Sequence, residues 1–401
     1  MNRPRTIKVT PAPALQVGAD GGMEATPLLE PAPLCVLGND RTPPLIQPAV
    51  RPGADACFGP RGACLLGPQG PLLVCDTGHH RLLGWNRLPT VDRTPADWQI
   101  GQPGFGAEGR NGRRAPGAAS LNVPTGICAL GHGIAVGDAW NHRVLIWNEI
   151  PTADNTAADL VLGQADFTGT DANRGRPNAD ADGLNWPYGV HSDGERLLVA
   201  DAGNRRVLVW DRPPRQNGQP ADRVLGQHDF DAHDENAGGE PNAMSMRWPH
   251  GIALWRGRLC VADAGNNRIQ VWEDMPREHG APCDWILGQT GVARVDHNQS
   301  LYWPRANTLN MPYGIGAAGD WLLAADTANS RLLAWHVDDL ADGAPARRLA
   351  GQPDFHAKGD NRWRPPAADS FCWPYGLHVC ANMVAVADSG NNRVSLWRLG
   401  T

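Results

Sequence analysis

The sequence predicts an all-β protein, a six-bladed β-propeller, from two observations. The first is a motif, Asp-x4-Arg-x3-Trp, that recurs every 62 or 63 residues; its six copies begin at Asp76, Asp138, Asp201, Asp263, Asp326 and Asp388. The second is a composition with 47 glycines and 35 prolines in 401 residues, which favours short strands joined by turns. Because units repeated at a fixed period share faces with their neighbours, we expect one body and not several domains.

Each repeat contains four predicted strands. In the third repeat they are expected at residues 187–191, 196–201, 206–210 and 223–227, where apolar residues alternate or cluster. Residues 202–204, Ala-Gly-Asn, are expected to form a turn between the second and third strands, because Gly and Asn tolerate positive φ. Four antiparallel strands repeated radially six times make the blades of a propeller.

The two ends of the chain are expected to meet in one blade. The sixth repeat stops after its third strand, and a copy of the missing fourth strand, Leu-Cys-Val-Leu-Gly, stands at residues 34–38. We therefore predict a single propeller over residues 33–401, with residues 33–38 completing the last blade and closing the ring. Closure removes exposed strand edges that invite aggregation. Residues 1–32, rich in Pro, Ala and Gly, are expected to form a flexible tail.

Three repeats share the pattern Val-Ala-Asp-x-Gly-Asn-x-Arg-apolar, at residues 199–207, 261–269 and 386–394. In this pattern the chain resembles the NHL repeat, and the resemblance extends over residues 34–401. It implies a propeller but selects no function, since NHL-type propellers include RNA-binding modules, protein-binding modules and a zinc-dependent amidating lyase. The lyase has several histidines between the Pro and Gly of its first strands. Here only His250 occupies that position, so the lyase activity is not carried over.

The Asp, Arg and Trp of the motif are expected to be structural. The carboxylate and the guanidinium face each other across the turn between the second and third strands and can pair bidentately. The tryptophans are expected to pack between blades. Because six identical copies cannot all be catalytic, we assign these residues to holding the fold together.

Each repeat is longer than the roughly 40–50 residues that are typical of a propeller blade. The excess lies between the fourth strand of one blade and the first strand of the next, where 18 or 19 residues separate Phe or Val from Pro. We expect these insertions to be ordered and to form a crown on the face that also carries the Asp-x-Gly-Asn turns. The crown is the predicted recognition surface, because loops on a rigid scaffold usually carry binding.

The crown is uneven in charge. Residues 106–119 carry three arginines against one glutamate, and residues 231–247 carry four carboxylates against one arginine. These charges are either solvated loop residues or a bipolar docking surface for a partner protein. Trp140 and Trp363 are expected to be exposed, where they either anchor a partner or pack within the loops. The candidate partner-binding residues are Arg113, Arg114, Trp140 and Trp363.

The residue between Pro and Gly at the start of each first strand is expected at the crown-side mouth of the central channel. Three of the four tyrosines of the chain occupy this position. Such a ring either suits a half-buried strand end or binds an anionic or aromatic small molecule or a peptide end. The candidate ligand-binding residues are Arg61, Thr125, Tyr188, His250, Tyr313 and Tyr375.

A second ring position, three residues further along each first strand, holds two cysteines and two histidines, which are donors that suit borderline metals. The alternative is that these side chains face neighbouring blades as ordinary core residues, since the spacing is not a short-range ligand motif. No other cofactor is expected, because the P-loop, dinucleotide, HExxH and nucleophile-elbow motifs are absent from the sequence. The candidate metal ligands are Cys64, Cys128, His191 and His378.

Bulk properties exclude several classes of protein. The net charge of −6 disfavours nucleic-acid binding, which needs a surplus of Lys and Arg. The sequence has no run of 18 apolar residues and no apolar segment near its start, so we expect no membrane span and no secretory signal. The nine cysteines are scattered and form no CxxC pair, which indicates reduced thiols and a cytoplasmic protein.

Two functional hypotheses follow. The first is a binding module or scaffold that recognises a protein or peptide partner through its crown. The alternative is an enzyme or small-ligand protein, of the lyase or hydrolase class, with its site at the channel mouth. RNA binding is disfavoured by the acidic balance and by the lack of a sustained basic stripe. The sequence predicts neither the identity of the partner nor the oligomeric state.

Overall fold

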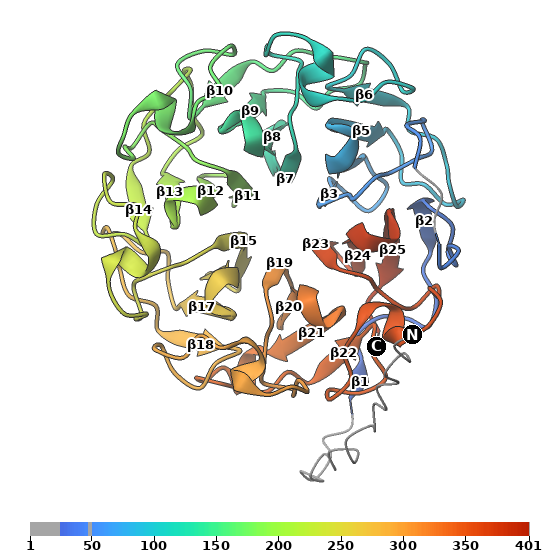
Figure 1. The fold of residues 1–401 in the computed structure, drawn as a ribbon, viewed down its shortest axis with the longest axis vertical. Coiled ribbons are helices and arrows are strands. Elements are labelled where there is room, and N and C mark those ends of the chain that lie inside the picture. The colour runs from blue at the N-terminus through green and yellow to red at the C-terminus, as the bar shows by residue number, and fades with distance from the viewer. Residues whose placement is uncertain (1–24, 47–49, 401) are drawn as a thin grey trace, which may run out of the picture.

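The computed structural model describes residues 25–46 and 50–400. They form six sheets arranged radially around a central channel, so the predicted six-bladed all-β propeller is confirmed (Figure 1). In each blade the strands run antiparallel, the first at the channel and the fourth at the rim. In the described part of the chain, the helical segments are 3-10 turns of three or four residues.

The blades are numbered along the chain, and their strands have the following bounds. Blade one contains β3 (Gly62–Leu65), β4 (Leu72–Asp76), β5 (Arg81–Trp85) and β6 (Trp98–Ile100), and blade two contains β7 (Pro124–Leu130), β8 (Gly133–Asp138), β9 (Arg143–Trp147) and β10 (Leu160–Leu162). Blade three contains β11 (Pro187–Ser192), β12 (Leu197–Asp201), β13 (Arg206–Trp210) and β14 (Arg223–Leu225), and blade four contains β15 (Pro249–Trp255), β16 (Arg258–Asp263), β17 (Arg268–Trp272) and β18 (Trp285–Leu287). Blade five contains β19 (Pro312–Ala318), β20 (Trp321–Asp326), β21 (Arg331–His336) and β22 (Arg348–Ala350), and blade six contains β23 (Pro374–Cys380), β24 (Met383–Asp388), β25 (Arg393–Arg398) and β2 (Cys35–Gly38).

The short helical turns fall into two main sets. The first connects the second and third strands of each blade and comprises η1 (Thr77–His79), η3 (Ala139–Asn141), η5 (Ala202–Asn204), η7 (Ala264–Asn266), η9 (Thr327–Asn329) and η12 (Ser389–Asn391). The second lies in the insertions and comprises η2 (Arg110–Arg113), η4 (Ala172–Gly175), η6 (Glu235–Gly238), η8 (His297–Ser300) and η11 (Asp360–Trp363). A further turn, η10 (Val337–Asp339), follows β21.

The N-terminal part of the described chain packs on two blades. Strand β2 pairs antiparallel with β25 and takes the outermost place in blade six. Before it, β1 (Thr26–Pro27) pairs parallel with β22, and the side chains of Leu28 and Leu29 are buried between blades five and six. The predicted flexible tail is therefore wrong for residues 25–32, because burial of two leucines fixes this segment. The rest of that prediction, residues 1–24, lies outside the described residues.

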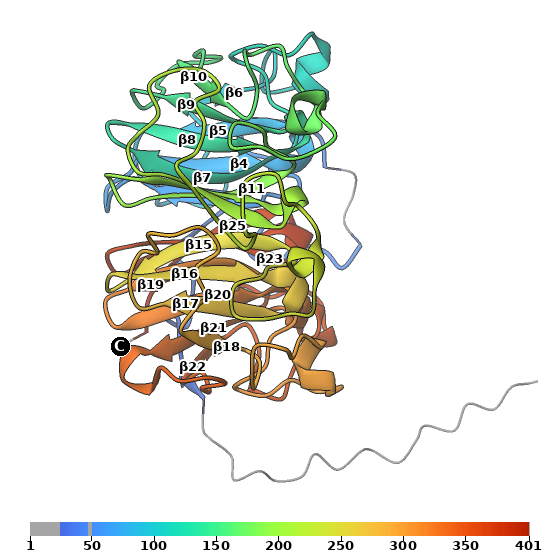
Figure 2. The same cartoon turned by 90° about the vertical axis from the view of Figure 1, so that its left-hand side faces the viewer.

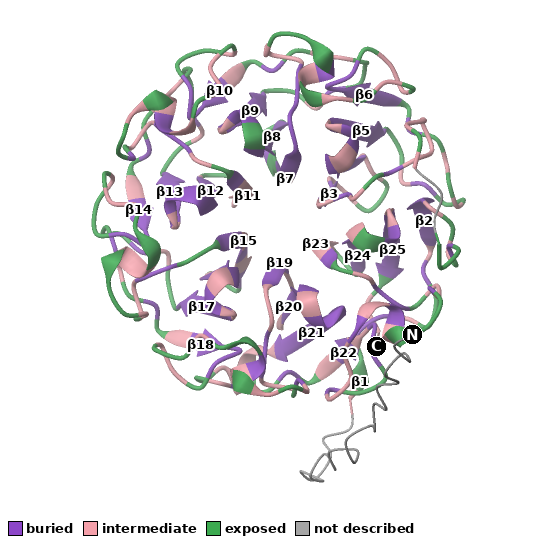
Figure 3. Ribbon diagram, in the orientation of Figure 1, coloured by how far each residue is buried: buried purple, intermediate pink, exposed green. Residues whose placement is uncertain are grey.

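The hydrophobic core lies between the blades. It consists of six clusters, each built from side chains of two adjacent blades. The motif tryptophans belong to these clusters and are at most 2% exposed, as predicted. Each indole N–H also donates a hydrogen bond. In blade three, Trp210 Nε1 donates to the Gln219 carbonyl at 3.1 Å. Figure 3 shows burial concentrated in the strands and exposure in the loops.

The motif arginines are fully buried and clamp the insertions to the blades. In blade three, Arg206 Nε donates to Asp201 Oδ2 at 2.8 Å. Its Nη atoms donate instead to backbone carbonyls, Phe230 at 2.5 Å and Asp180 and Gly183 at 2.9 and 3.0 Å. The predicted bidentate pairing is wrong, because carbonyls of the loops that enter and leave the blade occupy those nitrogens. All six blades have the same ion pair.

The insertions gather on one face of the disc, which we call the crown face (Figure 2). They are tied to the turns of the blades by pairs of asparagines. Asn173 in η4 and Asn204 in η5 exchange side-chain hydrogen bonds of 3.2 and 2.8 Å. The loop asparagine has a φ of 51°, a left-handed conformation that Asn tolerates better than most residues. The crown therefore lies on the same face as the Asp-x-Gly-Asn turns, and its loops are fixed to the scaffold.

Candidate functional site

The mouth of the channel is formed by the starts of the six first strands. In β11 the register shifts between Pro187 and Val190, and Tyr188 within this irregularity lines the channel. The glycine that follows is required by the close approach of the next blade. A Cβ on Gly189 would lie 1.8 Å from the carbonyl oxygen of His250. The Pro-x-Gly sequence therefore brings neighbouring first strands together and narrows the channel.

Five of the six predicted mouth residues form a closed ring of contacts, which we call the mouth ring. Its members are Arg61, Tyr188, His250, Tyr313 and Tyr375. The ring centroids of Tyr188 and His250 are 4.4 Å apart, those of His250 and Tyr313 4.3 Å, and those of Tyr313 and Tyr375 4.2 Å. The guanidinium carbon of Arg61 lies 4.6 Å from the ring centroid of Tyr375. Arg61 Nη1 then donates to the Tyr188 hydroxyl at 3.2 Å, which closes the circle.

The sixth predicted residue, Thr125, does not join this contact ring. Its side chain is buried, and its hydroxyl donates to the backbone carbonyl of Tyr188 at 2.9 Å. The role of Thr125 is thus to fasten blade two to blade three. Because this side chain is short and turned to the backbone, Arg61 of blade one reaches past it to Tyr188 of blade three.

The mouth ring carries one positive charge. Burial lowers the pKa of His250 to about 4, and the nearby charge of Arg61 adds to the effect, so the imidazole is neutral at pH 7. Burial raises the pKa of Tyr313 and of Tyr375, so both phenols stay protonated. Among the described residues that line the cavity, Arg61 is the only charged side chain, and none is Asp or Glu.

A cavity of about 260 Å³ occupies the channel at and below this ring. Its walls are mainly backbone and apolar side chains of the first strands. His191 and His378 also line it, and burial lowers the pKa of each imidazole to about 4. The cavity is thus uncharged apart from Arg61 at its mouth.

The predicted metal ligands are not assembled into a metal site. Cys64 and Cys128 lie in the apolar clusters between blades, where burial raises the pKa of Cys64 to about 12 and that of Cys128 still further. His378 Nδ1 accepts a hydrogen bond from the backbone of Leu65 at 3.2 Å, and its Nε2 lies 3.7 Å from the Cys64 sulfur. Over residues 25–46 and 50–400, no group of three or more His, Cys, Asp or Glu is placed to hold a metal ion. The four residues do not converge on one point, because Cys64 and Cys128 pack in the clusters between blades while His191 and His378 line the cavity.

The predicted partner-binding residues all lie on the crown face. Trp140 is 43% exposed in η3, and the guanidinium of Arg110 stacks over its ring at 5.1 Å. Arg113 and Arg114 are exposed in the same insertion as Arg110, and Trp363 in η11 is 71% exposed. The structure thus leaves both tryptophans accessible to a partner.

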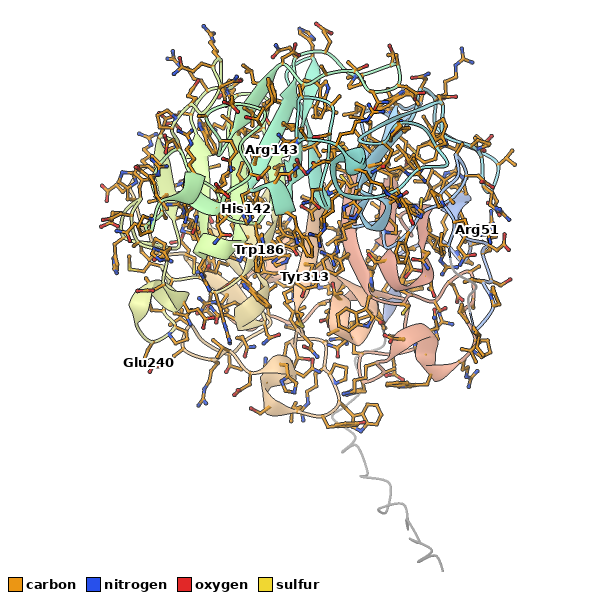
Figure 4. All side chains as sticks on the ribbon, turned by 45° about the horizontal axis from the view of Figure 1, so that its top comes forward. Arg51, His142, Arg143, Trp186, Glu240 and Tyr313 are labelled. Carbon is orange, nitrogen blue, oxygen red and sulfur yellow. The ribbon has the colours of Figure 1, made fainter. Side chains whose placement is uncertain are left out.

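The sequence analysis missed three further exposed tryptophans, Trp186, Trp248 and Trp373, each directly before the proline of a first strand. Each stands two residues before a mouth residue in the chain, and His250 Nδ1 lies 3.0 Å from the carbonyl oxygen of Trp248. The signal was visible in the sequence as the repeated segments Trp-Pro-Tyr-Gly and Trp-Pro-His-Gly. Trp186 has a φ of 52°, and its backbone N–H donates to His142 Nδ1 of the preceding blade at 3.1 Å (Figure 4).

Comparison with known proteins supports the repeat assignment. The model of the NHL repeat matches residues 246–272, which run from the end of an insertion through β15, β16 and β17. The chain is a six-bladed propeller that contains an NHL repeat in its fourth blade. No curated protein matches its sequence. In the described part of the propeller, no helix is long and apolar enough to cross a membrane.

Several solved structures are similar to this chain at low sequence identity. Raptor from Chaetomium thermophilum is 11% identical with a TM-score of 0.44, and the alignment covers 93% of this chain but only 30% of that chain. Hydrazine synthase from Kuenenia stuttgartiensis is 10% identical with a TM-score of 0.49 over 88% of this chain and 97% of that chain. Virginiamycin B lyase from Staphylococcus aureus is 10% identical with a TM-score of 0.43 over 87% and 98%. Similarity at this level transfers no activity to this chain.

Proposed function

We propose that this propeller is a binding module whose crown face receives a protein or peptide partner. The proposal rests on the distribution of exposed apolar side chains. The described residues include ten large apolar side chains that are exposed, and nine of them lie in the insertions or turns of the crown face. The exception is Val91, in the connection between β5 and β6. A concentration of exposed apolar residues on one face is typical of an interaction site.

The chemistry of these residues favours a protein partner. Five of the nine are tryptophans, and Trp and Tyr supply most of the anchoring energy of protein interfaces. Their backbone is held in place: the N–H of Trp186 is bound by His142, and that of Trp373 by the Ser330 hydroxyl at 3.2 Å. Anchors that are fixed before binding lose less conformational entropy when a partner docks.

Charge on the crown adds a preferred orientation for a partner. The insertion before β7 is basic, with Arg110, Arg113 and Arg114 exposed, whereas the insertion before β15 carries four carboxylates against Arg247. Arg247 lies 3.3 Å from Glu235, so one of these carboxylates is already paired. Such opposed patches support recognition of a partner with the complementary arrangement and steer its approach.

Site-specific photo-crosslinking tests the proposal. A photoreactive phenylalanine analogue replaces Trp140 or Trp363 on the crown face, or His132 in the hairpin between β7 and β8 on the opposite face. After irradiation in cells of the native host, both crown positions should capture the same protein, and the His132 position should not. Capture from the Trp140 position should be lost when Trp363 is changed to Ala, and capture from the Trp363 position should be lost when Trp140 is changed to Ala. Equal capture from the two faces, or none from the crown, contradicts the proposal.

The cellular compartment is also a proposal. All nine cysteines are free thiols, and seven of them are buried. Reduced cysteines that serve as small core residues are typical of a reducing compartment, which supports the cytoplasm. The acidic balance of the chain supports a partner other than nucleic acid.

A further inference from the structure

We propose that the mouth ring is a binding site for a carboxylate, with Arg61 as the group that holds it. The site lies at the centre of the crown face, but it stands independently of any protein partner that the crown receives. Its parts are the guanidinium of Arg61, the hydroxyls of Tyr188 and Tyr375 and the cavity behind them.

Arg61 differs from the buried arginines of the fold. Each motif arginine is paired with an aspartate at 2.7–2.9 Å. Arg61 is only partly exposed, yet among the described residues of the cavity lining it meets no carboxylate. A guanidinium withdrawn from water in this way lacks a counter-ion, and an anionic ligand supplies one.

The ring fixes the direction in which Arg61 can bind. Its guanidinium stacks on Tyr375 and uses Nη1 to contact the Tyr188 hydroxyl at 3.2 Å. Stacking on an aromatic face leaves the N–H groups at the edge of the guanidinium plane free to bind two oxygens of one planar group. The phenols of Tyr188 and Tyr375 stand on either side of the guanidinium and can donate further hydrogen bonds to such oxygens.

The charge of the site favours a monoanion. The cavity lining holds one formal positive charge, from Arg61, and no second cation. A carboxylate balances this charge, whereas a phosphate dianion leaves a net negative charge in a partly buried site. A carboxylate is also planar and matches the fork of the guanidinium. The site is therefore expected to prefer carboxylates over inorganic phosphate.

The carboxylate can come from a small organic acid or from the C-terminus of a peptide. A small acid would place its body in the cavity, whose apolar walls include Val190, Ile252, Ile315 and Leu377. A peptide would enter from the crown side, where the exposed Trp186, Trp248 and Trp373 each stand two residues before a mouth residue. The two sources share the chemistry at Arg61 and differ in which neighbours they touch.

Binding of defined probes to the full chain tests the proposal. The probes are benzoate, the dipeptide acetyl-Ala-Phe with a free carboxylate, the same dipeptide as an amide, and inorganic phosphate. Dissociation constants are measured by ligand-observed NMR for wild type, Arg61→Gln and Arg61→Lys. The control is Arg87→Gln, which removes an exposed arginine after β5. Thermal melting of each variant shows whether it is folded.

At least one of the two free acids should bind wild type, and Arg61→Gln should weaken that binding about tenfold or more, as expected for a lost charged hydrogen bond. Arg61→Lys should retain part of the affinity, and Arg87→Gln should retain all of it. The amide and phosphate should bind more weakly than the acid. If Arg61→Gln does not fold, partial affinity in folded Arg61→Lys still supports the proposal, and unchanged affinity there overturns it.

The dissociation constants of the two acids for Trp186→Ala distinguish a peptide C-terminus from a small acid. A weaker dissociation constant for acetyl-Ala-Phe, with benzoate unchanged, assigns the site to peptide C-termini; no change for either assigns it to small acids. The proposal is overturned if neither acid binds wild type at about 10 mM, if phosphate binds more tightly than both acids, or if folded Arg61→Gln binds them as wild type does. Because benzoate does not need the crown loops, these outcomes are separate from failure of the crosslinking test.

Discussion

The buried clamp in each blade predicts a large and specific loss of stability when its arginine is removed. In blade three, Arg206→Met keeps most of the side-chain volume but deletes the guanidinium. Asp201 would then keep only the Asn204 side chain and the Asn185 backbone N–H, both at 2.7 Å, as hydrogen-bond partners. Its carboxylate would stay fully buried without a counter-charge.

The size of the effect follows from these contacts. Removing one partner of a buried ion pair costs about 3–5 kcal/mol, mostly because the other charge is left unpaired. Three backbone carbonyls of the insertions also lose their hydrogen-bond donor. Where water cannot reach these carbonyls, the loss of free energy of unfolding increases further. We therefore expect Arg206→Met to lower the free energy of unfolding by at least about 3 kcal/mol.

Urea unfolding followed by tryptophan fluorescence measures this change. The matched control is Arg215→Met, an exposed arginine in the same blade, for which a change below about 0.5 kcal/mol is expected. A double-mutant cycle with Asp201→Asn should show coupling of about 1–3 kcal/mol, because the double variant buries no unpaired charge. If Arg206→Met is no less stable than Arg215→Met, or if the two clamp substitutions are additive, the clamp does not act as described.

Two further predictions concern pH and the chain end. Burial lowers the pKa of His250 to about 4 in the folded protein. On acidification the unfolded chain therefore takes up a proton near pH 6.5, whereas the folded chain does so only near pH 4. The free energy of unfolding should thus fall between pH 6.5 and 4, by up to about 3 kcal/mol from this residue. His250→Phe should lose less stability than wild type between pH 7 and 4.5 in urea unfolding, and an identical loss in both proteins would contradict the assignment. Deleting residues 1–40 removes β1 and β2 and exposes the edge of β25, so the melting temperature should fall and aggregation should rise; a truncated protein that melts as sharply as the full chain would refute this role.

The two proposed binding sites, at the mouth ring and on the crown, differ in their chemistry. The crown offers exposed tryptophans on fixed loops, which suits a large partner. The mouth offers one unpaired guanidinium among stacked aromatic rings, which suits a small charged group. Trp186 and Trp373 stand two residues before Tyr188 and Tyr375 in the chain, so a protein partner that ends in a carboxylate would meet both proposed sites.

The positions of the candidate residues were predictable from the repeat. A residue at a given place in each repeat occupies the same place in each blade, so the six Pro-x-Gly positions had to meet around the channel. The crown was predictable for the same reason, since insertions of 18 or 19 residues at the same place in each repeat must emerge on one face. The exposed tryptophans before the prolines also have a signal in the sequence, since Trp-Pro recurs at the same place in three repeats.

Side-chain direction was not predictable in this way. The pattern gives no sign that Thr125 turns to the backbone of the next blade, or that Arg61 then crosses to Tyr188, 127 residues away in the chain. Cys64 and Cys128 likewise turn into blade contacts and not toward one another as ligands. The burial of Leu28 and Leu29 depends on a groove between two blades that are distant in sequence.

The repeat alone predicts the number of blades, the strand order, the crown and the set of residues at the channel mouth, because a strict period repeats one local structure six times. Which of those residues touch, how the motif arginines divide their hydrogen bonds and why Arg61 meets no carboxylate within the described cavity lining are features of the tertiary packing. These features depend on how closely neighbouring blades approach, which the glycines of the first strands permit and the side chains of the adjacent blade complete.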